Sequence, residues 1–178
     1  QLPEGTDVQV LDESGEALPL VTQEAADAVE LGDPIWCPVG IAPKALTGGC
    51  TASYTSLQDL IDELKNAGGQ VTNPAKAGVI WIAYNYDNLT YDPGVTQFIL
   101  DGLDFDDGDL IFTDTMDNFA LTIKGGWSGT ALSTVINQNT PSLFSGASLS
   151  IINWKGAVTI SDILIDSATS NTTTGDNT

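Results

Sequence analysis

The chain has 178 residues, of which 42% are hydrophobic and only 16% are charged, and 24 acidic residues against five lysines give it a formal net charge of −19. A nucleic-acid partner requires a basic surface, which this composition excludes. Histidine and arginine are both absent, which excludes Ser-His-Asp catalysis, His-ligated zinc and bidentate guanidinium recognition of carboxylates or phosphates.

The first 31 residues are acidic and weakly patterned. Their apolar pairs, Val8 with Val10 and Leu18 with Leu20, indicate two short extended segments. This stretch has too little apolar surface to fold alone, so we expect either a disordered acidic terminus or an arm that docks on its own domain or on a neighbouring subunit. Because residue 1 is Gln rather than Met, we interpret it as the end left by removal of a signal peptide, with a fragment boundary as the alternative.

The two cysteines, Cys37 and Cys50, lie in a Pro- and Gly-rich loop over residues 33–55. An even count in such a loop favours a disulfide, with two buried free thiols as the alternative, because zinc needs more ligands than two thiols supply. The bond would close a short ring and stabilise the fold by about 3 kcal/mol. It would also imply an oxidising setting, extracellular or at the cell surface. The sequence contains no stretch of about 18 apolar residues that predicts a membrane span.

Residues 56–67 carry the clearest helical pattern. Leu57, Leu60, Ile61 and Leu64 recur at helical spacing, so one face of the predicted helix is apolar. Capping patterns precede this face, and a Gly-Gly pair follows it at a position that favours a helix end. We expect the apolar face to be buried against the first strong strand that follows.

After residue 77 the pattern changes from helical to extended. An uninterrupted apolar run over 79–83 is typical of a strand that is buried on both sides. Shorter segments follow, separated by Asp-Gly, Gly-Gly or Asn-containing breaks. Because no second strong helix appears between them, we expect an all-β class with a lone helix. The further predicted strands centre on residues 98–100, 110–112, 121–123, 149–151, 158–160 and 163–165.

Two segments of the strand region are similar to each other. Residues 121–129 (LTIKGGWSG) and 149–156 (LSIINWKG) each contain an apolar-polar-apolar strand followed by Trp and then Gly, at an offset of 28 residues. Internal similarity at this spacing is typical of solenoid proteins. The first turn of a solenoid needs a cover, and the helix at 56–67 precedes the first strong strand, where such a cover belongs.

With these motifs the chain resembles the N-terminal portion of secreted bacterial right-handed parallel β-helix surface proteins. The resemblance runs from GDPIWCPVG at the start of residues 32–166 to the VTI strand near their end, and it carries no catalytic motif. It implies an all-β fold, namely a short right-handed parallel β-helix (a solenoid) with an N-terminal capping α-helix and an extended N-terminal arm. The chain then divides into the acidic arm (1–31), the β-helix domain with its disulfide loop and helix (32–166), and a polar Ser/Thr-rich tail (167–178).

The densest acidic cluster lies within residues 101–109. Alternating carboxylates followed by Gly are what a calcium loop supplies, and the candidate ligands are Asp104, Asp106 and Asp109. The Glu that an EF-hand loop carries at its twelfth position is missing, so a solvated acidic turn is the competing interpretation. No cofactor other than calcium is expected.

Other features concern glycans. Asn88 and Asn171 begin N-glycosylation sequons, a pattern that is common by chance. Paired carboxylates can cleave polysaccharides, but any basic proton acceptor would have to be one of five scattered lysines. Aromatic side chains stack on sugars or fill cores, and core packing is the commoner role. The tryptophans concerned are Trp36, Trp81, Trp127 and Trp154.

The last predicted strands are followed by a polar segment, and no sequence pattern covers their edges. We therefore expect contact with another molecule through strand addition or a head-to-tail interface. The favoured hypothesis is a secreted, noncatalytic structural subunit that polymerises head-to-tail with itself into an extracellular filament or sheath. A cell-surface adhesin or glycan-binding module is second, and a polysaccharide-active enzyme fragment is third. The predicted assembly residues are Val8, Val10, Leu18, Leu20, Val158, Ile160, Ile163 and Ile165.

Overall fold

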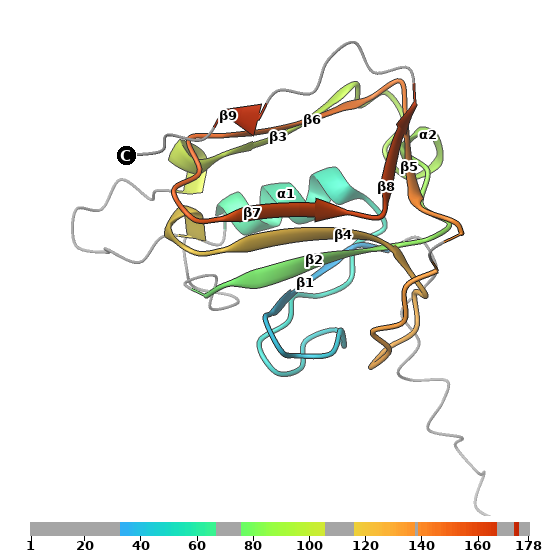
Figure 1. Cartoon of the computed structure of the whole chain (residues 1–178), viewed down its shortest axis with the longest axis horizontal. Coiled ribbons are helices and arrows are strands. Elements are labelled where there is room, and N and C mark those ends of the chain that lie inside the picture. Colours follow the sequence, from blue (N-terminus) through green and yellow to red (C-terminus); the bar gives the residue numbers. More distant parts are fainter. Residues whose placement is uncertain (1–32, 67–75, 106–115, 138, 167–172, 175–178) are drawn as a thin grey trace, which may run out of the picture.

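The computed structural model describes residues 33–66, 76–105, 116–137, 139–166 and 173–174 (Figure 1). The strands in these residues are β1 (Ile35–Pro38), β2 (Gly78–Ala83), β3 (Gln97–Asp101), β4 (Leu121–Trp127), β5 (Ser142–Ser145), β6 (Ser148–Ile152), β7 (Val158–Ser161), β8 (Ile163–Asp166) and β9 (Thr173–Thr174). The α-helices are α1 (Leu57–Asn66) and α2 (Asn88–Tyr91), and the 3₁₀ helices are η2 (Gly102–Phe105) and η3 (Met116–Asn118).

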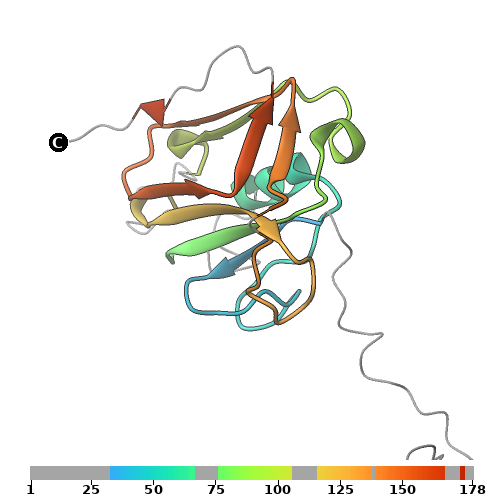
Figure 2. The same cartoon turned by 45° about the vertical axis from the view of Figure 1, so that its right-hand side comes forward.

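Three small sheets organise the strands. The four-stranded sheet has the order β1-β2-β4-β7, in which β1 runs antiparallel to β2 while β2, β4 and β7 are parallel. The other two sheets, β3-β6-β9 and β5-β8, are parallel throughout. Figures 1 and 2 place α1 between the four-stranded sheet and the β3-β6 pair, with β5 and β8 at one side.

The predicted all-β solenoid, a right-handed parallel β-helix with a lone capping helix, is wrong. The described residues form separate sheets of four, three and two strands, one of them mixed, together with two α-helices, and no closed solenoid is found among them. The proposed repeat fails for the same reason, because its two strands belong to different sheets. Leu121 pairs with Gly78 and Val158, whereas Leu149 pairs with Phe98.

The physical cause of this error is that apolar alternation identifies a strand without identifying its partner. The expected strands near 79–83, 98–100, 121–123, 149–151 and those of β7 and β8 are present. β1 lies in a segment that we expected to be a loop, and β5 and the short helix α2 were not predicted. The expected strand at 110–112 lies outside the described residues.

The main core forms around the apolar face of α1. Its four predicted apolar residues, Leu57, Leu60, Ile61 and Leu64, are at most 2% exposed. They pack in one cluster with residues of β2, β3, β4, β5 and β6, so α1 joins strands from all three sheets. The predicted burial of this face is confirmed, because the cluster includes the inward residues of β2.

A second, smaller core lies under the loop that connects β1 to α1. The predicted disulfide between Cys37 and Cys50 is present, and both cysteines pack with Ile35, Trp81 and Trp127. Lys124 places its ammonium group 5.4 Å from the centre of the Trp81 ring, a cation–π contact at the edge of this cluster. The disulfide therefore attaches the loop to β1 directly beneath a cluster of aromatic side chains.

The burial of α1 predicts the effect of a charge on its inner face. Leu60 is fully buried in an apolar cluster, so Leu60→Asp places a carboxylate among apolar side chains. We expect a loss of more than about 4 kcal/mol in the free energy of unfolding, enough to unfold a typical domain. Asp62→Asn on the exposed face is the matched control, and it should change stability by less than about 0.5 kcal/mol. Urea unfolding followed by circular dichroism measures both, and equal midpoints for Leu60→Asp and the unaltered chain would contradict the packing.

Candidate assembly surface

β7 and β8 are consecutive strands that border two different sheets. β7 pairs with β4 and β8 pairs with β5, and Asp162 between them has a φ of 57°. Asp tolerates this left-handed backbone better than most residues, so it suits the corner between the strands. Each of the two strands is the last in its sheet, so one of its edges pairs with no other strand among the described residues.

Two large apolar side chains of these strands are open to solvent. Ile160 in β7 is 43% exposed and Leu164 in β8 is 52% exposed. The other predicted assembly residues of these strands, Val158, Ile163 and Ile165, are half-buried against the main core. Exposed strand edges are normally blunted by lysine, proline or a bulge, and β7 and β8 contain neither lysine nor proline.

The opposite border of the four-stranded sheet is closed. The segment after Cys50 lies along the outer edge of β1, where the Thr51 amide donates to the Trp36 carbonyl at 2.9 Å and the Tyr54 amide donates to the Pro34 carbonyl at 3.0 Å. The Thr51 hydroxyl accepts from the Trp36 amide at 3.1 Å. The disulfide holds this segment in place, so β1 offers no free edge comparable to that of β7.

Charge is distributed unevenly along the chain. Residues 1–33 contain nine of the 24 acidic residues and no lysine. Residues 34–58 contain one lysine and residues 118–161 contain two, and neither stretch contains an acidic residue. Two aspartates, Asp162 and Asp166, accompany the β7–β8 edge. The negative charge of the chain therefore comes from residues outside 34–58 and 118–161.

A buried carboxylate at the start of α1 is the strongest polar feature of the core. Asp92 is 3% exposed and accepts hydrogen bonds from the amides of Leu57 at 2.9 Å and Gln58 at 3.1 Å. It also accepts from the hydroxyls of Ser56 and Tyr86. A carboxylate at a helix N-terminus satisfies amides that lack partners within the helix and interacts favourably with the helix dipole. The arrangement explains Asp92 as an anchor of α1, because these four donors all belong to the fold itself.

The hydroxyl of Tyr86 donates a hydrogen bond to the same carboxylate. Its ring is stacked against Tyr91, with centroids 5.5 Å apart, and is 1% exposed. Burial, and then the hydrogen bond to Asp92, raise the pKa of the Tyr86 phenol far above its ordinary value of 10.0. Sequence patterns did not reveal the role of Asp92, because it contacts the start of α1 across a separation of 34 to 36 residues.

The raised pKa of Tyr86 predicts a loss of stability in alkali. The unfolded phenol loses its proton above about pH 10 while the folded one keeps it, so the stabilisation is complete below that pH and decreases as pH rises, by up to about 1.4 kcal/mol per pH unit. Tyr86→Phe removes this dependence and costs about 1–3 kcal/mol at neutral pH by removing one donor to Asp92. Burial also raises the pKa of Tyr54, with smaller contributions from Glu63 and Asp59, so the difference between the two proteins isolates Tyr86.

Unfolding midpoints measure this loss of stability when they are recorded from pH 8 up to about pH 11, which is roughly one unit above the ordinary phenol pKa. Parallel curves for Tyr86→Phe and the unaltered chain would show that the Tyr86 proton is not held by the fold.

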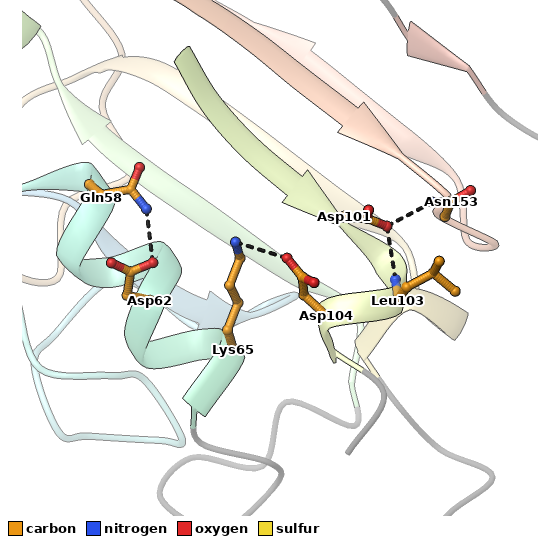
Figure 3. A network of polar contacts seen from close by, with 7 residues as sticks. All are labelled: Gln58, Asp62, Lys65, Asp101, Leu103, Asp104 and Asn153. Atoms are coloured by element: carbon orange, nitrogen blue, oxygen red, sulfur yellow. Dashed lines mark hydrogen bonds and ion pairs between the residues drawn. The ribbon is translucent and has the colours of Figure 1, made fainter. Parts of the chain in front are cut away.

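The acidic cluster around η2 makes contacts that a calcium site would have to break. Asp104 forms an ion pair with Lys65 of α1 at 3.1 Å (Figure 3). Asp101 accepts from the Leu103 amide at 3.1 Å and from the Asn153 side chain at 2.8 Å. The other two candidate calcium ligands, Asp106 and Asp109, lie outside the described residues. Within the part of the chain that the structure describes, no three Asp, Glu or Cys side chains gather as a metal site would require.

The glycan-related residues fall in the interior or beyond the described residues. All four tryptophans are at most 7% exposed, which favours the core-packing interpretation over sugar stacking. Asn88 is 1% exposed, and its side-chain oxygen accepts from the Ser145 amide at 2.5 Å. A glycan on Asn88 would have to displace this contact. Asn171 lies outside the described residues, as do the predicted assembly residues Val8, Val10, Leu18 and Leu20.

Comparison with protein-family models, with curated proteins and with solved structures finds no match to this chain. Neither α-helix in the described residues is long and apolar enough to cross a bilayer. The most distinctive feature of the described residues is the contrast between the closed edge of β1 and the open edges of β7 and β8.

Proposed function

We propose that this chain is a secreted, noncatalytic structural subunit that associates head-to-tail with copies of itself into a filament or sheath. The observation that carries the proposal is the β7–β8 edge, where Ile160 and Leu164 are exposed beside unpaired strand borders in the described residues. Strand addition to such an edge satisfies backbone groups and covers apolar side chains in the same contact.

The strand donor in this proposal is the acidic arm of residues 1–31. The closed β1 edge is unsuited to pair with the β7–β8 edge of a neighbour, because its outer backbone groups already bond to Thr51 and Tyr54. The arm carries apolar pairs at alternating positions, Val8 with Val10 and Leu18 with Leu20, which match the period of a strand.

Electrostatic repulsion sets the conditions for this association. Two copies that each carry −19 repel each other, but at about 0.15 M salt the Debye length is only about 8 Å. Contacts between apolar side chains and paired strand edges act at shorter range than that. The proposal therefore includes a salt dependence, in which assembly is weaker at low ionic strength.

The alternative functions have less support in the described residues. A glycan-binding module would be favoured by exposed aromatic side chains, whereas all four tryptophans are buried. A polysaccharide-active enzyme would be favoured by two facing carboxylates open to solvent, whereas Asp92 is enclosed by donors from α1 and Tyr86. The extracellular location rests on the disulfide, because such bonds persist in oxidising compartments.

Leu164→Lys tests the proposed edge. The side chain is half exposed in the isolated chain, so the lysine keeps its ammonium group in water and the fold should change by less than about 0.5 kcal/mol. In an assembled edge the same ammonium group would be buried, so polymers should be lost. Leu103→Lys, at a 66% exposed leucine on η2, is the matched control and should polymerise normally. Sedimentation and negative-stain microscopy at physiological salt measure both, and normal fibres from Leu164→Lys would rule out this edge.

Deletion of residues 1–31 tests the donor. We expect a folded domain with an unchanged melting transition that does not polymerise, because the core of α1 and the three sheets lies outside the deleted segment. Circular dichroism and sedimentation measure the two properties together. Fibres of normal length from the deletion would exclude the arm as donor, and an unfolded product would instead assign the arm to its own subunit's core.

A further inference from the structure

The disulfide is buried in the same cluster as two tryptophans. Cys37 and Cys50 are at most 2% exposed, and they belong to the second core together with Trp81 and Trp127. Cys37 pairs with Val79 across β1 and β2, which makes Cys37 and Trp81 diagonal neighbours on one face of the sheet. The ring centroids of Trp81 and Trp127 lie 6.3 Å apart. The two tryptophans and the disulfide are therefore close enough for an electron to pass between them.

The other two tryptophans pack away from the disulfide. Trp36 precedes Cys37 in the sequence, but its side chain belongs to the main core, on the opposite face of β1. Trp154 also belongs to the main core, where its ring packs edge-on against Phe105 with the centroids 5.3 Å apart. The chain therefore contains its own comparison, with two tryptophans in the cluster of the disulfide and two in the other core.

An indole excited by ultraviolet light is a strong one-electron reductant, and a disulfide accepts one electron. The transfer leaves a radical cation on the indole and places the electron in the antibonding orbital of the S–S bond. That bond then breaks into a thiyl radical and a thiolate. The indole radical cation loses its N–H proton to water and the thiolate takes up a proton from water, so the products are one tryptophanyl radical, one thiyl radical and one thiol. Light is the only input from outside the chain and its solvent.

The surroundings of the two indoles differ in how well they support oxidation. The Trp127 N–H donates to the Ser133 carbonyl at 2.7 Å, and an acceptor at this position stabilises the positive charge that oxidation leaves on the ring. The Trp81 N–H is buried without a hydrogen-bond acceptor among the described residues. The Lys124 ammonium group lies 5.4 Å from the centre of the Trp81 ring and repels a positive charge on it. Trp127 is therefore the better electron donor.

We infer that Trp127 and the Cys37–Cys50 disulfide form an electron donor–acceptor pair, through which ultraviolet light reduces the disulfide inside the folded chain. Both sulfurs are buried, so a reductant in solution reaches them poorly, whereas an indole in the same cluster needs no access from solvent. Reduction removes the covalent link between β1 and the segment that closes its edge. The pair thus makes the closure of β1 sensitive to light, whether or not the chain associates with itself.

Irradiation of the full folded chain under nitrogen, at the long-wavelength edge of tryptophan absorption, tests the pair. Maleimide labelling after unfolding, followed by mass spectrometry, counts the thiols formed at Cys37 and Cys50. The unaltered chain should gain thiols with dose, and Trp127→Phe should slow this gain at least fivefold. Trp154→Phe removes an indole from the main core and is the matched control, so its rate should stay within twofold of the unaltered chain. Equal rates for the two variants, or no thiols from the unaltered chain, would overturn the inference.

The choice between the two indoles has a test of its own. Trp81→Phe should keep at least half the rate of the unaltered chain, because Trp127 is still present. In the Trp127→Phe background, Lys124→Gln removes the cation beside Trp81 and should raise the rate at least twofold. A loss of thiols from Trp81→Phe as large as that from Trp127→Phe would overturn the assignment of Trp127 as the donor, and so would a rate that Lys124→Gln leaves unchanged.

The same irradiation in concentrated urea shows whether the fold creates the pair. Unfolding separates the side chains of the second core, so Trp127→Phe and Trp154→Phe should then gain thiols at the same rate. Circular dichroism before irradiation establishes that each variant is folded in buffer and unfolded in urea. A difference between the two variants that persists in urea would assign thiol formation to position in the sequence rather than to the folded cluster, and would overturn the inference.

Discussion

The need to satisfy backbone N–H and C=O groups along strand edges governs this molecule. β1 pairs with β2 on one side and with the segment around Thr51 on the other, so its edge is closed within the chain. The disulfide between Cys37 and Cys50 joins β1 to that segment and keeps the closure in place. β7 and β8 have no equivalent partner among the described residues, and this asymmetry is the basis of the proposed assembly.

The main core connects α1 with all three sheets. The four apolar residues of α1 belong to one buried cluster with residues from all three sheets. The N-terminus of α1 is held by Asp92, a buried carboxylate that accepts from two backbone amides and two hydroxyls. Because a carboxylate buried with fewer donors would be costly, these contacts depend on one another, and the position of α1 depends on all of them.

Local patterns predicted the local structure well. The helix was predictable because Leu57, Leu60, Ile61 and Leu64 repeat at the helical period, and all four are buried. The disulfide was predictable because the chain contains only two cysteines. The sheets were not predictable in this way, since Leu121 and Leu149 have the same alternation but pair in different sheets.

Long-range and exposed features were missed for related reasons. Asp92 reaches α1 from a distant turn, so no short motif connects them. The positive φ angles and the exposure of Leu46 and Leu132 were also missed, because nothing in the sequence distinguishes them from other loop leucines. Open edges on the last strands were predicted from the lack of a covering pattern; Ile160 is 43% exposed, whereas Val158, Ile163 and Ile165 are half-buried, and their role in assembly stays a prediction.

Hydrogen–deuterium exchange of the assembled and dispersed chain tests the central claim most directly. If the β7–β8 edge is the site of strand addition, the amides of residues 158–166 should exchange at least tenfold more slowly in the assembled form, because new backbone hydrogen bonds protect them. The amides of β2 should be equally protected in both forms, since β2 lies between β1 and β4. Assemblies in which residues 158–166 exchange as fast as in the dispersed chain would contradict the account.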